Sequence, residues 1–181
     1  MKNKTLLFFD QEFSGLHQNT TLISLGIVSE CGKTFYAEYN DYSVMQCNDW
    51  IKENVLANLN LEAYSNNQSL KDWKIKGNSA QIKEALTTWL AQFDKIKMVS
   101  DCLAYDWVLF CEIFGGAFGI PENIHYIPVY ICTMFEDRDI DPDINREEFA
   151  DLKNGSIKHN ALWDAFVIME CYYRLKKITI K

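Results

Sequence analysis

The sequence lacks an uninterrupted apolar run of about 18 residues, so it predicts no transmembrane helix. It also lacks the apolar core of a secretory signal. Two lysines precede the apolar residues 5–9, as in the start of a signal peptide, but Asp10 and Glu12 end that run after five residues. We therefore expect a cytoplasmic protein without a membrane partner.

The six cysteines contain no C-x-x-C pair, which leaves zinc and redox motifs unsupported. An excess of basic residues is also missing, because the net charge is −7 and the pI is about 5.0. This charge argues against a protein that coats nucleic acid through a basic face, but it is compatible with an enzyme that grips a strand end at a metal site. No repeat, low-complexity tract or linker divides the chain, so residues 1–181 are expected to form one domain.

The hydrophobic pattern predicts a mixed α/β fold. Three apolar stretches joined by short turns predict an antiparallel meander, and helices and strands alternate after it. We expect a five-stranded sheet with helices on both faces. The expected strands are 5–9, 21–29, 34–39, 96–100 and one within 123–133. The expected helices are 48–56, one capped by Ser79, 103–114 and 161–175. Residues 59–78 are expected to be mostly loop.

A first candidate site lies where the strand predicted at 5–9 ends. Asp10 and Glu12 are two positions apart, so in a strand they project to the same face, with Gln11 on the other. Two neighbouring carboxylates repel each other, and a hard divalent cation such as Mg²⁺ relieves that repulsion. The alternative at this point is a strand that simply ends in polar residues at the surface.

Two later segments add further candidate ligands. Asp101 and Asp106 lie at the start of an apolar helix, where each could either bind a cation or cap the helix. Asp164 lies in an apolar helical stretch, and a buried carboxylate there requires a cation or another partner. His159 alone would be a surface or capping residue, but beside several carboxylates it becomes a candidate general base.

The acidic stretch 137–151 has carboxylates at the spacing of a calcium-binding EF-hand loop. The position that must be glycine for the sharp turn is Pro142, whose φ is fixed at negative values. We interpret this stretch as a solvated acidic loop.

Taken in order, these motifs resemble the DEDDh family of 3′–5′ exonucleases, and especially the compact exoribonucleases of the mycobacterial type. The resemblance spans residues 8–165, and a histidine in the last motif places it in the "h" rather than the "y" subgroup. The motifs are Asp10-x-Glu12, Tyr105-Asp106 in the middle of the chain, and His159 five residues before Asp164-Ala165.

The resemblance implies a ribonuclease H-like fold, with a five-stranded sheet in which only the second strand is antiparallel. It implies that two Mg²⁺ or Mn²⁺ ions are held by Asp10, Glu12, Asp106 and Asp164, and that His159 is the general base. Asp106, preceded by a tyrosine, matches the family motif better than Asp101, which we interpret as a helix-capping residue.

The implied reaction removes nucleoside 5′-monophosphates from the 3′ end of single-stranded RNA. Glu12, Phe13 and Trp107 are candidate substrate contacts, although both aromatic rings could instead belong to the core. RNA is favoured over DNA, and because many relatives of this kind dimerise, the resemblance also implies a homodimer. The alternatives are a DNA exonuclease of the proofreading or repair type, and a catalytically inactive nucleic-acid-binding module of the same fold.

Overall fold

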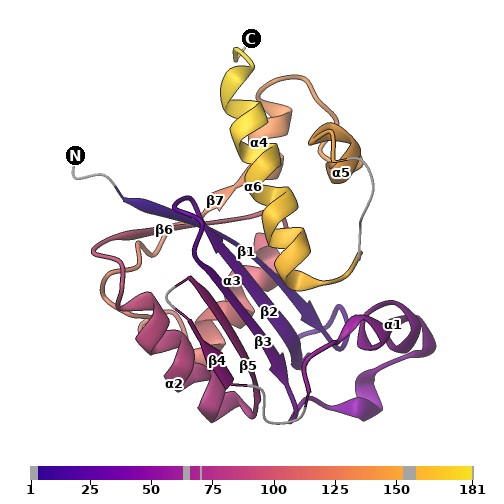
Figure 1. Ribbon diagram of the computed structural model, residues 1–181. Coiled ribbons are helices and arrows are strands. Elements are labelled where there is room, and N and C mark those ends of the chain that lie inside the picture. The colour runs from indigo at the N-terminus through magenta and orange to yellow at the C-terminus, as the bar shows by residue number, and fades with distance from the viewer. Residues whose placement is uncertain (1–3, 63–65, 70, 153–157, 181) are drawn as a thin grey trace.

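A computed structural model describes residues 4–62, 66–69, 71–152 and 158–180 of the chain. Its centre is a seven-stranded sheet with the order β4-β5-β3-β2-β1-β6-β7 (Figure 1). The strands are β1 (Thr5–Phe13), β2 (Leu22–Ser29), β3 (Thr34–Tyr39), β4 (Asn66–Gln68), β5 (Asp72–Gly77), β6 (Ile96–Ser100) and β7 (Val129–Tyr130).

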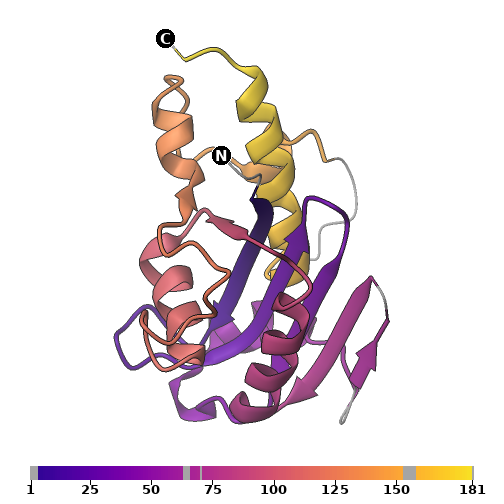
Figure 2. The same cartoon turned by 90° about the vertical axis from the view of Figure 1, so that its left-hand side faces the viewer.

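Helices cover both faces of this sheet, as the sequence predicts. Figures 1 and 2 show α2 and α3 on the face opposite to α6. In the described residues, no helix is both long and apolar enough to cross a membrane. The α-helices are α1 (Asp49–Asn54), α2 (Ser79–Leu90), α3 (Leu103–Ile113), α4 (Ile131–Glu136), α5 (Arg146–Phe149) and α6 (Ala161–Lys177), and the 3₁₀ turns are η1 (Val44–Gln46) and η2 (Leu56–Asn58).

Strand β1 lies between the two layers of helices and sends alternate side chains to each. Phe9 packs against Phe110 of α3, with ring centroids 5.5 Å apart. Phe8 points to the other face and meets Tyr172 of α6 at 5.3 Å. Both phenylalanines are fully buried, so the strand is fixed by two separate hydrophobic clusters. By the same alternation, Asp10 and Glu12 face the α6 side.

The pairing of β1 leaves one of its edges open beyond Phe8. The strand pairs in parallel with β6 only from Thr5 to Phe8, whereas its antiparallel pairing with β2 continues to Phe13. The strand is therefore longer than the predicted 5–9, and its carboxylates lie inside it rather than after it. Ligand sites in open α/β sheets commonly form at such carboxyl ends of parallel strands.

The predicted five-strand count was too low, because the range 59–78 contains two further strands. The β5 strand pairs in parallel with β3, and β4 pairs antiparallel with β5, so β2 is not the only antiparallel strand. Strand β5 has only two large apolar residues, Trp73 and Ile75, among the charged residues Asp72, Lys74 and Lys76, so its hydrophobic pattern is weak. The cap of α2 also differs from the prediction, since Asn78 rather than Ser79 accepts the hydrogen bond from the Gln81 amide.

The start of α6 is seated directly on β2. A Cβ atom at Gly26 would lie 2.2 Å from the carbonyl carbon and oxygen of Ala161, so only glycine permits this approach. Asn160 caps the helix by accepting a hydrogen bond from the amide of Trp163. The helix thus begins at a defined point above the sheet, and Asp164 lies within its first turn.

Candidate active site

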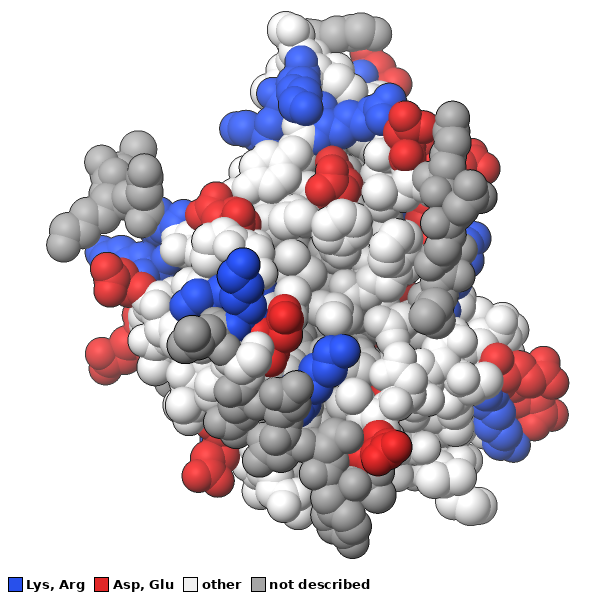
Figure 3. Space-filling view, in the orientation of Figure 1, with Lys and Arg blue, Asp and Glu red and all other residues white. Residues whose placement is uncertain are grey.

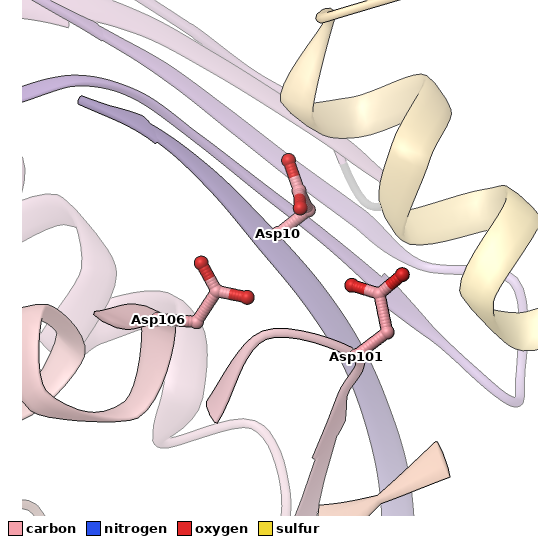
Figure 4. A group of neighbouring side chains, drawn as sticks. All are labelled: Asp10, Asp101 and Asp106. Atoms are coloured by element: carbon pink, nitrogen blue, oxygen red, sulfur yellow. The ribbon is translucent and has the colours of Figure 1, made fainter. Parts of the chain in front are cut away.

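Five carboxylates gather in two groups that share Asp10. One group is Asp10, Glu12 and Asp164, and the other is Asp10, Asp101 and Asp106. Within each group, one oxygen from every residue lies within 4.8 Å of the others. Figure 4 shows the second group, with side chains from β1, from the residue just after β6 and from α3 gathered around one point.

The fold explains why these residues meet. Alternation along β1 places Asp10 and Glu12 on the face of the sheet that α6 covers. The close packing of the start of α6 against Gly26 places Asp164 near them. The imidazole of His159, just before α6, lies beside this group, with its Nδ1 3.8 Å from Oε1 of Glu12.

A cavity of about 340 Å³ opens over this cluster. Four of the five carboxylates reach it, while Asp106 lies beneath and is 1% exposed. The lining residues are Asp10, Glu12, Asp101, Asn145, Arg146, Glu147, Lys158, His159, Asp164, Val167 and Ile168.

Burial and mutual repulsion make it unfavourable for all five carboxyl groups of this cluster to be ionised at once. Burial, together with the carboxylates of Asp164 and Asp106, raises the pKa of Glu12 from 4.5 to about 8. Burial, together with the charges of Asp101 and Glu147, raises the pKa of Asp164 from 3.8 to about 7. Carboxyl groups with raised pKa values in a cleft indicate a functional site.

The shared Asp10 and the deepest carboxylate, Asp106, show the same effect. Burial raises the pKa of both well above the ordinary value. The Ser100 hydroxyl donates a hydrogen bond to Oδ2 of Asp106, but Oδ1 has no hydrogen-bond partner among the described residues. A buried carboxylate oxygen without a donor fits a cation ligand, and the oxygen-only donor set suits Mg²⁺ or Mn²⁺.

The predicted capping role of Asp101 is wrong. The N-cap of α3 is Cys102, and no side chain caps that helix end. Asp101 instead faces the cavity and pairs with Arg146, whose Nε lies 3.3 Å from Oδ2 of the aspartate. Because Asp101 also lies within ligand distance of Asp10 and Asp106, it is a fifth candidate carboxylate for binding a cation.

His159 has an unusual backbone and a lowered proton affinity. Its φ is +61°, in the left-handed region, and its ring makes a T-shaped contact with that of Trp50 at a centroid distance of 4.9 Å. Burial and the charge of Lys158 lower the pKa of the imidazole below its usual 6.5. The ring is therefore neutral at about pH 7 and able to accept a proton.

The two aromatic residues predicted to contact substrate do not line the cavity. Phe13 stacks on Tyr105, with a centroid distance of 5.2 Å and an interplanar angle of 17°. Trp107 stacks on Phe110 at 5.7 Å and packs against the core beneath α3. Their substrate roles stay predictions.

Arg146, Glu147 and Lys158 are lining residues that the sequence interpretation missed. Arg146 and Glu147 belong to α5, inside the stretch interpreted as a solvated loop. One signal was available, since Arg146 is the only basic residue between Arg138 and Lys153. The carboxylate of Glu147 also accepts a hydrogen bond of 2.8 Å from the indole of Trp163.

Charges on the face shown in Figure 3 are dispersed. Lys and Arg gather over the C-terminal end of α6, whose last turn carries Arg174, Lys176 and Lys177. Elsewhere among the coloured residues of this face, the two signs are interspersed.

Two curated proteins of one bacterium are similar to this chain over most of its length. Two curated 3′–5′ exoribonucleases of Mycobacterium tuberculosis, MT2234.1 of strain CDC 1551 / Oshkosh and Rv2179c of strain ATCC 25618 / H37Rv, are each 26% identical to this chain over 133 residues. The match covers 72% of this chain and 74% of each relative.

A solved structure confirms the predicted fold. It is the nuclease domain of 3′hExo, a DEDDh family member, bound to rAMP, and it superposes with a TM-score of 0.60 at 12% identity. The superposition covers 99% of this chain and 97% of the other, which confirms the ribonuclease H-like class apart from the strand count. The family model of the Rv2179c-like 3′–5′ exoribonuclease domain matches residues 5–173, and the chain belongs to that family.

Proposed function

We propose that the protein is a metal-dependent exoribonuclease that removes nucleotides one at a time from the 3′ end of single-stranded RNA. The observation that carries this proposal is the pair of carboxylate groups sharing Asp10, with the neutral imidazole of His159 at their edge. Membership of the exoribonuclease family supports the same reaction.

Two divalent cations fit the donor set. Asp10, Glu12 and Asp164 would hold one ion, and Asp10 with Asp106 and Asp101 would hold the other. When bound, such a pair stabilises negative charge on the attacking and leaving oxygens of the phosphodiester. The buried carboxylates would then be paired rather than forced to take up protons.

His159 serves as the general base in this proposal. It accepts a proton from the water that attacks the phosphorus of the last phosphodiester. The bond from phosphorus to the 3′ oxygen breaks, that oxygen takes up a proton, and the terminal residue leaves as a nucleoside 5′-monophosphate. Lys158 lies on the cavity wall and supplies a cation that suits a substrate phosphate.

The acidic protein is expected to hold its substrate at the strand end rather than along a basic groove. A net charge of −7 disfavours extended contact with the phosphate backbone. Glu12, Phe13 and Trp107 are the substrate contacts that we retain from the sequence for testing. RNA rather than DNA is the proposed substrate because the curated relatives are named as exoribonucleases.

A time course with 5′-labelled single-stranded RNA, run beside matched DNA in Mg²⁺, Mn²⁺ or EDTA, tests the proposal. We expect a ladder that shortens from the 3′ end, faster on RNA, and that EDTA stops. His159→Ala should slow it about 10²- to 10⁴-fold, the usual contribution of a general base. His125→Ala is the matched control, because His125 lies at the opposite end of β6, outside the cavity.

Either of two results contradicts the proposal. An RNA that stays intact with every metal, in the presence of well-folded protein, would indicate a binding role. Equal activity of the His159→Ala and wild-type proteins would remove the general base from the mechanism.

A further inference from the structure

The backbone of His159 adopts a conformation that needs support from its surroundings. A φ of +61° is uncommon for a residue with a side chain and is a strained conformation. Such strain persists only where neighbouring contacts hold the residue in place. The residues on each side of His159, Lys158 and Asn160, both receive such contacts from distant parts of the chain.

On the N-terminal side, Asn58 holds the chain by its side-chain amide. Its Nδ2 donates a hydrogen bond of 2.6 Å to the carbonyl oxygen of Lys158, which is 100 residues away in sequence. The same amide donates to the carbonyl of Asn54 at 2.6 Å, so Asn58 is itself tied to the end of α1. The peptide that leads into His159 is thereby fixed.

On the C-terminal side, Tyr36 of β3 holds Asn160. The Nδ2 of Asn160 donates to the hydroxyl oxygen of Tyr36 at 3.3 Å, while its Oδ1 accepts the amide of Trp163 and caps α6. The capping side chain is therefore oriented by the sheet as well as by the helix. His159 lies between these two attachments.

Glu38 is bound both by Tyr36 and by the segment that follows Asn58. The hydroxyl of Tyr36 donates to Oε1 of Glu38 at 3.1 Å. The amides of Asn60 and Leu61, just beyond Asn58, donate to the same oxygen at 2.7 and 3.0 Å. Lys76 of β5 pairs with Oε2 at 3.0 Å.

The Glu38 side chain is completely buried, which makes these contacts essential to it. A buried carboxylate is costly unless it is paired and hydrogen-bonded, and here one ammonium, one hydroxyl and two amides meet that need. None of these groups lines the catalytic cavity. Their common effect is to join β3, the segment after η2 and the start of α6 around one point.

We propose that Glu38, Tyr36 and Asn58 form a clamp that holds His159 in its left-handed conformation and directs its imidazole toward Glu12. All three are positioning residues, since they act on the reaction only through His159. This inference rests on the proposed role of His159 as general base. It gives a role in positioning to the buried ion pair of Glu38 and Lys76, which does not line the cavity.

Tyr36→Phe is the sharpest test, because it removes one hydroxyl and leaves Glu38 with Lys76 and two amide donors. We expect kcat on single-stranded RNA to fall about 10- to 100-fold, since a misplaced catalytic group has an effect of that size. KM should stay unchanged. Asn58→Ala, which releases the other side, should shift the same two constants in the same direction.

Tyr39→Phe is the matched control. It makes the same chemical change in the same strand, and Tyr39 is also buried, but its hydroxyl has no hydrogen-bond partner among the described residues. We expect kcat and KM of this variant to equal those of the wild type. A fall in kcat equal to that of Tyr36→Phe would overturn the clamp, because it would show a general effect of the strand.

A double-mutant cycle with His159→Ala separates positioning from a general structural effect. If the clamp acts through His159, adding Tyr36→Phe to His159→Ala should cause no further loss of kcat. A further loss as large as that of Tyr36→Phe alone would overturn the clamp and leave the proposed exonuclease intact. Full activity of His159→Ala would overturn the general base, and the clamp with it.

Discussion

Asp101 has two kinds of neighbour in the cavity. The carboxylates of Asp10 and Asp106 lie within ligand distance of it (Figure 4), and the guanidinium of Arg146 pairs with it at 3.3 Å. Burial raises the pKa of Asp101 even though Arg146 opposes that rise. Arg146 therefore offsets only part of the cost of burying this carboxylate, and we expect a cation shared with Asp10 to offset the rest.

Asp101→Asn is expected to weaken one cation position and leave the other intact. Asparagine keeps an oxygen for Arg146 but loses the charge, so Mn²⁺ affinity at the Asp10–Asp101–Asp106 group should fall about 10- to 100-fold, as for losses next to a metal. Calorimetric titration with Mn²⁺ should show two comparable sites in the wild type and one tight and one weak site in the variant.

Asp94→Asn is the control for this titration, because Asp94 is exposed and lies at the far end of β6 from the cavity. It should bind Mn²⁺ as the wild type does. Two unchanged sites in Asp101→Asn would instead show that Asp101 serves only as the ion-pair partner of Arg146.

For single residues, the sequence predicts contacts between near neighbours in the chain better than contacts between distant residues. Asp10 and Glu12 are two residues apart in a strand, so their common face follows from alternation alone. The pair of Asp101 and Arg146 joins residues 45 positions apart, and neither local pattern indicates it. No local pattern indicates the left-handed backbone of His159 either, because it depends on the contacts of its neighbours Lys158 and Asn160 with Asn58 and Tyr36.

Among the elements, α6 matters most to the site because it carries Asp164 and follows His159. Its first residue lies against Gly26 of β2, so the height of the helix above the sheet depends on the absence of a side chain there. The helix is capped by Asn160, which is also bound to the sheet through Tyr36. The distance between the carboxylates of β1 and α6 is therefore set by backbone packing.

Gly26→Ala should displace α6 and reduce both stability and activity. The new Cβ would lie 2.2 Å from backbone atoms of Ala161, and overpacking of this kind costs about 1–3 kcal/mol or more. We expect a lower Tm and a kcat reduced at least about tenfold, since Asp164 moves with the helix. Thermal unfolding and the RNA assay measure the two effects.

Gly15→Ala is the comparison variant, because its Cβ would meet only ring atoms of His17 at 3.0 Å, and that exposed side chain can turn away. Its Tm should stay close to that of the wild type. An equally stable and active Gly26→Ala protein would show that the start of α6 can shift without consequence for the site.

Element prediction succeeded where the hydrophobic pattern was strong and failed where tertiary pairing decided the structure. The apolar periodicity of α2 and the glycines after α3 indicate those helices directly. Strand β5 is mostly polar and lies near the sheet edge, so its short alternation of two apolar residues is a weak signal beside its pairing with β3. Helix α5 has four residues, too few for a periodic pattern.

For the molecule as a whole, the carboxylate cluster links stability to both pH and metal. In the metal-free protein the folded state holds protons on Glu12 and Asp164 up to about pH 8 and 7, whereas the ordinary pKa values are 4.5 and 3.8. The unfolded chain therefore binds fewer protons between these limits, and the free energy of unfolding must fall as pH rises through them. The lowered pKa of His159 acts in the opposite direction, but it is one group against several.

In EDTA the Tm should consequently decrease from about pH 5 to pH 8, and Mg²⁺ or Mn²⁺ should restore it most strongly at pH 8. An ion at 100 times its Kd adds about 2.7 kcal/mol per site, which corresponds to roughly 5–10 °C for a chain of this size. Scanning calorimetry at several pH values, with and without metal, measures both trends.

Glu12→Gln provides the internal control for this experiment. It removes one titrating carboxyl and one ligand of the Asp10–Glu12–Asp164 group, so the pH slope of its Tm in EDTA should be shallower and its response to metal smaller. A metal-free wild-type protein whose Tm rises between pH 5 and pH 8 would show that the cluster does not hold its protons. The raised pKa values, and the argument that these carboxylates require cations, would then both be wrong.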